Sequence, residues 1–486
     1  MATKSGSSSA RATTAARRPS RDVGGNDVGG GTPARSPLNN AFIFVFGALG
    51  GMLFGFDTGI ISGVSPLVEE EFRLNVAQTG FITSSVLIGS CIGALSIGSL
   101  SDRFGRKKLL IVSAILFLLG SGLCAAATGF TMMVIARIIL GLAVGAASAL
   151  TPAYLAELAP KERRGSLSTL FQLMITFGIL LAYASNLGFL GHNIAGIRDW
   201  RWMLGSALIP SALLLIGGLL LPESPRYLIS KGDDRNALKV LTLIRKDVDQ
   251  AQVKLELDEI KEVASHGSKG GVGELFRIAR PALIAAVGLM LFQQLVGINS
   301  VIYFLPQVFI KGFHFPESNA IWVSVGIGVV NFGATIVATL IMDKFPRKKL
   351  LTFGSVVMAV SLAAMTALNY MGDVSKLAVP TMVLIGVYIL GFATSWGPIA
   401  WVMIGEIFPL SVRGIGTSFG SAANWLGNFI VSQFFLVLLS MFHNNVGGPF
   451  AVFAVFAVLS IPFVAYFVPE TKGKSLEEIE RSMVKR

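Results

Sequence analysis

The feature that most constrains this chain is a series of apolar runs of about 20 residues, the length that spans a bilayer as a helix. These runs recur from residue 39 onward, and short polar junctions separate them. We read twelve spans, and the pattern therefore predicts an all-α membrane protein with twelve transmembrane helices. They lie near 39–63, 77–100, 108–128, 131–156, 166–190, 201–221, 279–311, 318–342, 349–371, 378–405, 412–440 and 448–468.

Composition supports a membrane protein and excludes other classes. Hydrophobic residues make up 53% of the 486 residues and charged residues only 14%, against about 25% charged in a typical soluble domain. A soluble fold of this size could not hide so much apolar material, which argues against a soluble enzyme and a disordered protein. The net charge of +12 could suggest nucleic acid. In a membrane protein, however, Lys and Arg collect on the cytoplasmic side, so we expect no nucleic-acid partner.

The polar segments divide the chain into five parts. The first residues are rich in Ser, Ala, Gly and Arg, which is typical of a disordered tail. No apolar segment of a signal peptide precedes the first span, and Asp22, Asp27 and many glycines argue against a transit peptide. We expect a disordered cytoplasmic tail at 1–38, an N-terminal six-helix half at 39–222, a cytoplasmic helical linker at 223–278, a C-terminal six-helix half at 279–469 and a cytoplasmic C-terminal tail at 470–486.

Basic residues gather at the junctions on one side of the predicted bundle. These junctions fall on the same side as both tails and the insert, so the positive-inside rule places both termini in the cytoplasm. We therefore expect a multi-pass protein of the cell membrane, plasma or inner. The basic residues are Arg103, Arg106, Lys107, Lys108, Lys161, Arg163, Arg164, Lys344, Arg347, Lys348 and Lys349.

The two halves repeat one another in sequence. Asp102-Arg-Phe-Gly-Arg-Lys-Lys matches Asp343-Lys-Phe-Pro-Arg-Lys-Lys, and Glu157 before Arg163-Arg-Gly matches Glu406 before Arg413-Gly. Repeated helical halves are typical of secondary transporters, which bind substrate near the midplane between the halves.

Together these motifs resemble the sugar porter family of the major facilitator superfamily, over essentially all of 39–482. The resemblance is strongest to bacterial proton-coupled monosaccharide symporters, which are relatives of the facilitative glucose carriers. It implies the major facilitator fold and sugar transport. The resembling segments are Asp102-Arg-Phe-Gly-Arg-Lys, Arg137-Ile-Ile-Leu-Gly, Pro222-Glu-Ser-Pro-Arg, Gln293-Gln-Leu-Val-Gly-Ile-Asn and Pro469-Glu-Thr-Lys-Gly.

Acidic residues accompany the basic ones at the helix ends, although topology requires no acids. Acid–base pairs across the two halves would tie the cytoplasmic ends together while the cavity opens outward, and the resemblance implies the same gate. A single exposed pair contributes only about 0–1 kcal/mol, so several are needed. The expected gate residues are Asp102, Arg106, Glu157, Arg164, Glu223, Arg226, Asp343, Arg347, Glu406 and Arg413.

Polar side chains inside the spans indicate a sugar site, because such groups usually face a cavity or a partner helix. Amides donate and accept hydrogen bonds together and so match hydroxyls. Trp401 would stack on the sugar, and Gly397 and Pro398 weaken the helix beside it. For Asn428 and Gln433 we expect interhelical hydrogen bonds instead. The expected substrate-binding residues, several of them strengthened by the resemblance, are Gln172, Gln293, Gln294, Asn299, Tyr303, Asn331, Trp401 and Asn424. Phe54, Phe56 and Trp425 either line the cavity or pack.

Asp57 is a carboxylate well inside the first apolar run, and Arg137, at the start of the fourth, is its expected partner. Burial favours the protonated acid and a nearby cation favours the anion. An Asp that alternates between these two forms can carry a proton. The resemblance implies this role directly, because proton-coupled members carry an acid here. The alternative is a static structural ion pair.

These observations predict a symporter that imports a monosaccharide, a hexose or a pentose, with a proton by alternating access. The alternatives are a facilitative sugar or cyclitol uniporter and a transporter-like nutrient sensor. We expect no enzyme activity, no cofactor and no metal, because no catalytic or metal-ligand constellation is present in the sequence. One twelve-helix chain encloses a complete site, so a monomer should function within the bilayer. Cys91 and Cys124 should be buried thiols, and Gly141, Gly145, Gly326 and Gly328 should allow close helix packing.

Overall fold

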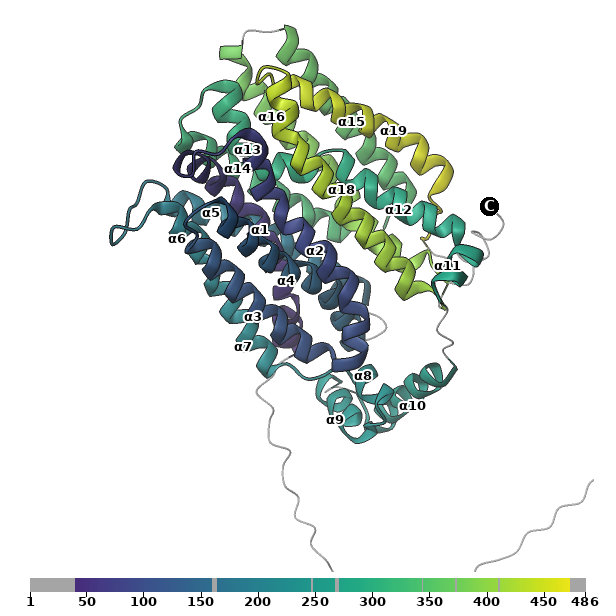
Figure 1. Cartoon of the computed structure of the whole chain (residues 1–486). Coiled ribbons are helices and arrows are strands. Elements are labelled where there is room, and N and C mark those ends of the chain that lie inside the picture. Colours follow the sequence, from purple (N-terminus) through teal and green to yellow (C-terminus); the bar gives the residue numbers. More distant parts are fainter. Residues whose placement is uncertain are drawn as a thin grey trace, which may run out of the picture. The chain divides into compact units, whose positions relative to one another are not determined.

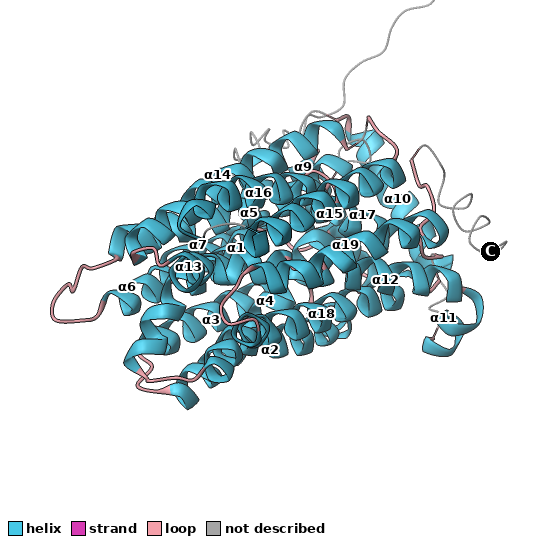
Figure 2. Cartoon of the chain, turned by 90° about the horizontal axis from the view of Figure 1, so that it is seen from above, coloured by secondary structure: helices cyan, strands magenta, loops and turns pink. Residues whose placement is uncertain are grey.

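A computed structural model describes residues 40–159, 164–245, 248–266, 271–342, 344–371, 374–409 and 411–472. Helices dominate this part of the chain, and its recorded β-bridge is an isolated pair in a loop, Ile194 with Ile197. Figure 2 shows no strand among the described residues. The predicted tail at 1–38, Asp343 and most of the predicted tail at 470–486 lie outside them.

The helices α1–α7 form the N-terminal half. Five single helices and one divided helix make its spans. The helices are α1 (Asn40–Glu71), α2 (Val76–Phe104), α3 (Arg106–Ala125), α4 (Phe130–Leu158), α5 (Arg164–Phe189), α6 (Asp199–Ser206) and α7 (Leu208–Leu220).

Four helices follow between the two halves, and we call them the insert. They are α8 (Pro225–Ser230), α9 (Asp234–Ile244), α10 (Gln250–His266) and α11 (Val272–Ile278). Arg245 pairs with Glu256 at 2.9 Å and donates to the carbonyl of Leu158 at the end of α4, at 3.0 Å. These contacts fix the insert beside one end of the bundle (Figure 1), which we call the insert end.

The helices α12–α19 form the C-terminal half, and two of its six spans are divided. The helices are α12 (Arg280–Leu295), α13 (Ile298–Phe313), α14 (Glu317–Ile341), α15 (Arg347–Met371), α16 (Val374–Ala393), α17 (Trp396–Glu406), α18 (Arg413–Met441) and α19 (Gly447–Phe467).

The described residues contain twelve helical segments that are long and apolar enough to cross a membrane, and they coincide with the twelve predicted spans. The largest difference is in the first span, which extends to Glu71 instead of ending near residue 63. Val64, Leu67 and Val68 continue its buried face. The predicted all-α architecture of two six-helix halves is confirmed.

The two divided spans of the C-terminal half are interrupted beside a glycine and a proline. Gly297 separates α12 from α13 with φ 90°, a left-handed conformation that glycine adopts without steric cost. A Cβ at Gly297 would lie 2.3 Å from the ring of Phe453, so a side chain does not fit there. The other interruption precedes Trp396, and Pro398 stands in the first turn of α17, where its missing N–H costs no helical bond. The predicted weakness near Pro398 is therefore a complete helix boundary.

Small residues bring the helices of the N-terminal half into close contact. A Cβ at Gly141 would lie 2.0 Å from the carbonyl oxygen of Val86, and one at Gly145 would lie 2.0 Å from that of Ser90. These two glycines therefore let α4 approach α2, as predicted. Gly326 was wrongly expected to act in the same way, because a Cβ there would meet nothing within 4 Å.

The two cysteines differ in their environment. Both are free thiols, and Cys124 is buried as predicted. Cys91 is only half-buried, so the prediction of a buried thiol was wrong for this residue. The apolar run around Cys91 therefore does not place every one of its side chains in the protein interior.

The two halves meet mainly along three pairs of helices, α1 with α13, α2 with α18 and α5 with α14, and α5 also contacts α17. Each pair takes one helix from each half, as the purple and blue ribbons beside the green and yellow ribbons of Figure 1 indicate. The polar residues singled out inside the spans lie around this junction.

Candidate functional site

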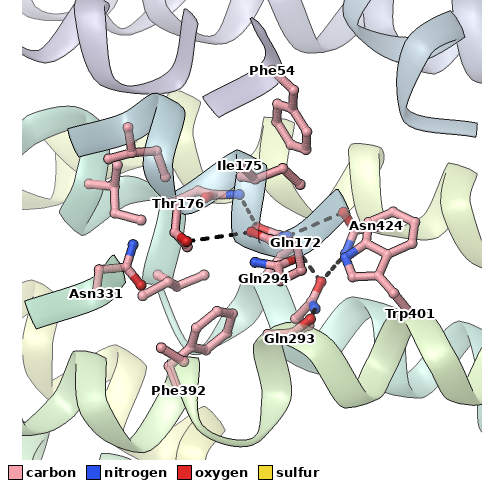
Figure 3. A pocket seen from close by; sticks show the side chains of 16 residues that line it. Phe54, Gln172, Ile175, Thr176, Gln293, Gln294, Asn331, Phe392, Trp401 and Asn424 are labelled. Atoms are coloured by element: carbon pink, nitrogen blue, oxygen red, sulfur yellow. Dashed lines mark hydrogen bonds between the residues drawn. The ribbon is translucent and has the colours of Figure 1, made fainter. Parts of the chain in front are cut away.

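A pocket lies between the two halves, and most of its lining comes from the C-terminal half. All of the predicted substrate-binding residues except Tyr303 line it (Figure 3). The structure adds several residues that sequence reasoning did not select, mainly apolar ones. The lining residues are Phe54, Gln172, Ile175, Thr176, Ile179, Gln293, Gln294, Ile298, Asn299, Ile302, Asn331, Phe392, Ala393, Gly397, Trp401 and Asn424.

Four amide side chains form a connected network on one wall. Gln294 Nε2 donates to Asn424 Oδ1 at 3.2 Å, and Asn424 Nδ2 donates to Gln293 Oε1 at 2.5 Å. Asn299 Nδ2 donates to Gln294 Oε1 at 2.9 Å. Gln294 and Asn299 are five residues apart and would share a face of one helix only roughly. The interruption at Gly297 brings them together.

Gln293 also ties the network to the second helix break. Its Nε2 donates to the carbonyl of Trp396 at 3.0 Å and to that of Gly397 at 3.3 Å. Trp401 lies one turn further along α17, and its half-buried ring lines the pocket. The amides and this ring give the pocket hydrogen-bonding groups and an aromatic face, which are the two features that a sugar requires.

Tyr303 is not among the residues that line the pocket. It is 1% exposed, and its hydroxyl lies 3.4 Å from Asn428 Nδ2. The interhelical hydrogen bonds predicted for Asn428 and Gln433 are confirmed. Asn428 of α18 bonds to Tyr303 of α13, and Ser84 Oγ of α2 donates to Gln433 Oε1 of α18 at 2.7 Å across the two halves. Trp425 is buried and packs on Phe54 with ring centroids 5.3 Å apart.

Asp57 and Arg137 form the expected ion pair. Arg137 Nη1 lies 3.1 Å from Asp57 Oδ1, with Arg137 fully buried and Asp57 6% exposed. Arg137 also donates to the carbonyls of Ile82 at 2.9 Å and Thr83 at 3.3 Å. Arg137 lies about two turns from the beginning of α4 (Phe130–Leu158), near the expected start of the fourth span. Asp57 is three residues beyond Phe54 on α1, so a single helical turn connects the ion pair to the pocket.

The charged residues at the insert end form contacts within the N-terminal half. Arg106 holds Glu157 through three hydrogen bonds of 2.9–3.2 Å and lies 3.3 Å from Asp102. Glu223 accepts from the backbone N–H groups of Arg106 at 2.9 Å and Lys107 at 3.2 Å, at the first turn of α3. A carboxylate is stabilised there by the free N–H groups and the helix dipole.

The C-terminal half repeats this arrangement with a residue that sequence reasoning missed. Glu470 accepts from the backbone N–H groups of Arg347 at 3.0 Å and Lys348 at 3.1 Å, at the start of α15. The signal was present in the sequence, because Pro469-Glu-Thr aligns with Pro222-Glu-Ser.

The remaining predicted gate residues have varied surroundings. Arg413 donates to the carbonyl of Phe408 at 3.1 and 3.2 Å, and Arg226 is exposed on α8. Glu406 lies at the end of α17, with one carboxylate oxygen buried. Asp343 and the side chain of Arg164 lie outside the described residues. Contacts across the halves at the insert end stay a prediction.

At the opposite end the structure shows contacts between the halves that the sequence patterns did not reveal. Lys311 of α13 lies 2.8 Å from Glu69 of α1. Gln307 Nε2 donates to Ser65 Oγ at 3.0 Å and to Glu69 at 3.3 Å. These residues join α13 to the N-terminal half.

The chain is similar over nearly its whole length to known transporters. A family model described as "Sugar (and other) transporter" matches residues 43–483. The chain is 46% identical to a D-xylose transporter of Levilactobacillus brevis, over 92% of this chain and 96% of that protein. It is 39% identical to the galactose-proton symporter of Escherichia coli strain K12, over 91% and 94% of the two chains.

The fold is similar to a solved transporter structure as well. The major facilitator superfamily proton:xylose symporter XylE, bound to 6-bromo-6-deoxy-D-glucose, superposes with a TM-score of 0.78 at 35% sequence identity. The match covers 91% of this chain and 99% of that chain.

Proposed function

Because the chain belongs to the sugar transporter family, we propose that it imports a monosaccharide, a hexose or a pentose, with a proton by alternating access. The observation that carries this proposal is the pocket between the halves, which combines a four-amide network with Trp401. The relatives, named as D-xylose and galactose–proton transporters, support the same substrate class.

In this proposal the sugar hydroxyls bind Gln172, Gln293, Gln294, Asn299, Asn331 and Asn424, and the C–H face of the ring stacks on Trp401. Amides suit this task because each can donate to one hydroxyl and accept from another. Tyr303, which does not line the pocket, acts through its contact with Asn428. The apolar side chains around the amides exclude water when the site closes.

Asp57 is the proposed proton carrier. As an anion it pairs with Arg137, and as a protonated acid it no longer neutralises that charge. The change alters the attraction between α1 and α4, and α1 also lines the sugar pocket through Phe54. Protonation and sugar binding therefore act on the same helix.

The charged residues at the insert end are the proposed cytoplasmic gate. The described contacts of Arg106, Glu157 and Glu223 order the helix ends of the N-terminal half. The remaining gate residues would join the two halves when the pocket opens to the other side. Because each exposed pair contributes about 0–1 kcal/mol, the gate needs several pairs together. The remaining gate residues are Asp102, Arg164, Arg226, Asp343, Arg347, Glu406 and Arg413.

The protein spans a membrane several times, and we infer that the insert end faces the cytoplasm. Basic residues such as Lys107 and Lys348 lie at this end, and the positive-inside rule places such junctions in the cytoplasm. Both termini would then be cytoplasmic, in the cell membrane. One chain contributes the whole lining of the pocket, which supports a functional monomer.

Uptake into proteoliposomes tests the proposal. Radiolabelled glucose, galactose, xylose and inositol are offered with an inward proton gradient, and again after a protonophore has removed it. We expect one or more monosaccharides to accumulate above the external concentration only with the gradient. Equal, non-accumulating uptake in both conditions would show a uniporter, and absence of uptake of every sugar would refute sugar transport.

A further inference from the structure

A proline inside α13 leaves one backbone acceptor without its helical donor. In an α-helix the carbonyl of residue 302 accepts from the N–H of residue 306, but Pro306 has no N–H. The Ile302 carbonyl belongs to a buried segment, and Ile302 itself is 5% exposed. A buried carbonyl without a partner is costly, so this one requires a donor from elsewhere.

A tyrosine from the other half supplies that donor. The hydroxyl of Tyr183, on α5, donates to the Ile302 carbonyl at 3.0 Å. Tyr183 is 1% exposed. The space for its ring depends on Gly328 of α14, where a Cβ would lie 2.9 Å from Tyr183 Cδ2. The ring is therefore held between the two halves.

This hydrogen bond lies at the boundary of the sugar pocket. Ile302 lines the pocket, and Tyr183 is one turn beyond the lining residue Ile179, toward the end opposite the insert. Asn299 of the amide network lies one turn before Ile302 on α13. The bond thus joins the helix that carries a sugar-binding amide to the N-terminal half.

We propose that Tyr183 and the proline-freed carbonyl of Ile302 form a latch that holds the pocket closed at the end opposite the insert. The latch is made only while the Tyr183 hydroxyl on α5 reaches the Ile302 carbonyl on α13. When the halves separate at that end, the hydroxyl withdraws and water in the opened cavity hydrates both groups. Tyr183 is therefore a positioning residue for α13. This inference rests on the proposed alternating-access function.

The test measures the distance between the halves and not only transport. Spin labels are placed on His192→Cys and His443→Cys, which lie in exposed loops of opposite halves, in a chain with Cys91→Ser and Cys124→Ala. Pulsed electron–electron double resonance on the full chain in nanodiscs gives the distribution of distances between the two labels. The short and long distances give the ratio of closed to open forms. Losing one hydrogen bond should shift that ratio roughly three- to ten-fold toward open in Tyr183→Phe.

The chain offers a matched control. Tyr388 of α16 donates its hydroxyl to the carbonyl of Val296 at 2.8 Å, beside the interruption at Gly297, and both residues belong to the C-terminal half. Tyr388→Phe removes the same chemical group from a contact that no separation of the halves breaks. Its closed-to-open ratio should equal that of the parent chain.

Pro306→Ala provides an independent arm that does not depend on the tyrosine. It restores the N–H at position 306, so the helix satisfies the Ile302 carbonyl in both forms. The variant should shift toward open, and Tyr183→Phe should then have little added effect. An unchanged ratio in Tyr183→Phe, or additive effects of the two substitutions, would overturn the latch. Failure of wild-type sugar uptake would refute the proposed function, and the distance measurement would still decide on the latch.

Discussion

Substitutions in the buried pair of Asp57 and Arg137 should separate the effect of the pair on protein stability from its effect on proton-coupled sugar uptake. Asp57→Asn removes the negative charge and keeps the shape of the side chain and one oxygen acceptor. Arg137 would retain its bonds to the carbonyls of Ile82 and Thr83. It would lose the carboxylate 3.1 Å from its Nη1 while remaining fully buried.

The expected cost follows from this geometry. Removing one partner of a buried ion pair destabilises a protein by about 3–5 kcal/mol, because the other charge is left uncompensated. The remaining acceptors around Arg137 place this variant near the lower limit, at about 3 kcal/mol. The double variant Asp57→Asn/Arg137→Met removes both charges and should recover most of that loss, since apolar replacement of a buried pair is often neutral.

Two measurements check the prediction. Thermal unfolding in detergent, followed by fluorescence-detected size-exclusion chromatography, should give a higher Tm for the double variant than for Asp57→Asn. Gradient-driven accumulation in proteoliposomes should be absent in both, because neither has an acid to protonate. Accumulation in the double variant at the wild-type level would refute the proton-carrying role of Asp57. Equal stability of Asp57→Asn and wild type would refute the reasoning about the uncompensated charge.

Three further substitutions test other parts of the structure. Gln294→Ala removes the centre of the amide network and should raise the sugar Kd, measured by calorimetry, about tenfold. Asn369 is a buried amide outside the pocket, and Asn369→Ala should leave the Kd unchanged. Equal affinities of Gln294→Ala and the wild type would show that Gln294 does not bind the sugar. Glu470→Gln weakens the cap of α15 and should lower the free energy of unfolding by about 1 kcal/mol in denaturant, and no loss would contradict the capping role. Lys311→Ala should favour opening at the end opposite the insert. The opening is measured as faster labelling of a cysteine introduced at that end. The exchange Glu69→Lys/Lys311→Glu should restore slow labelling, and a failure to do so would show that the contact is not electrostatic.

Much of the fold was predictable because spans depend on local composition. The bilayer requires apolar stretches of known length, and the duplicated helix-end motifs set the two halves in order. The amides of the pocket were predictable for a related reason, since Gln294 and Asn424 are polar groups in segments that otherwise exclude them. Candidate site residues were therefore predictable where a polar side chain interrupts an apolar segment.

The features that the sequence did not reveal depend on contacts between distant segments. Nothing in the chain around Lys311 indicates that Glu69 lies opposite it, and Gly326 has the same local setting as glycines that do pack closely. The divided seventh span is an intermediate case. The predicted run at 279–311 was longer than a bilayer needs, and Gly297 lay within it, yet the exact interruption follows from its left-handed backbone and the ring of Phe453.

The interruption at Gly297 also divides the amides of the proposed sugar site between two helices. Gln293 and Gln294 lie on α12, and Gln293 donates to the carbonyl of Trp396 at the start of α17, within the C-terminal half. Asn299 lies beyond the left-handed glycine, on α13, the helix that the proposed latch ties to the N-terminal half. If α13 moves away when the proposed latch opens, a sugar that arrives from the end opposite the insert should meet the amides of α12 before Asn299 joins them. Affinity should therefore differ between the two faces of the membrane, and transport should be kinetically asymmetric even at equal sugar concentrations.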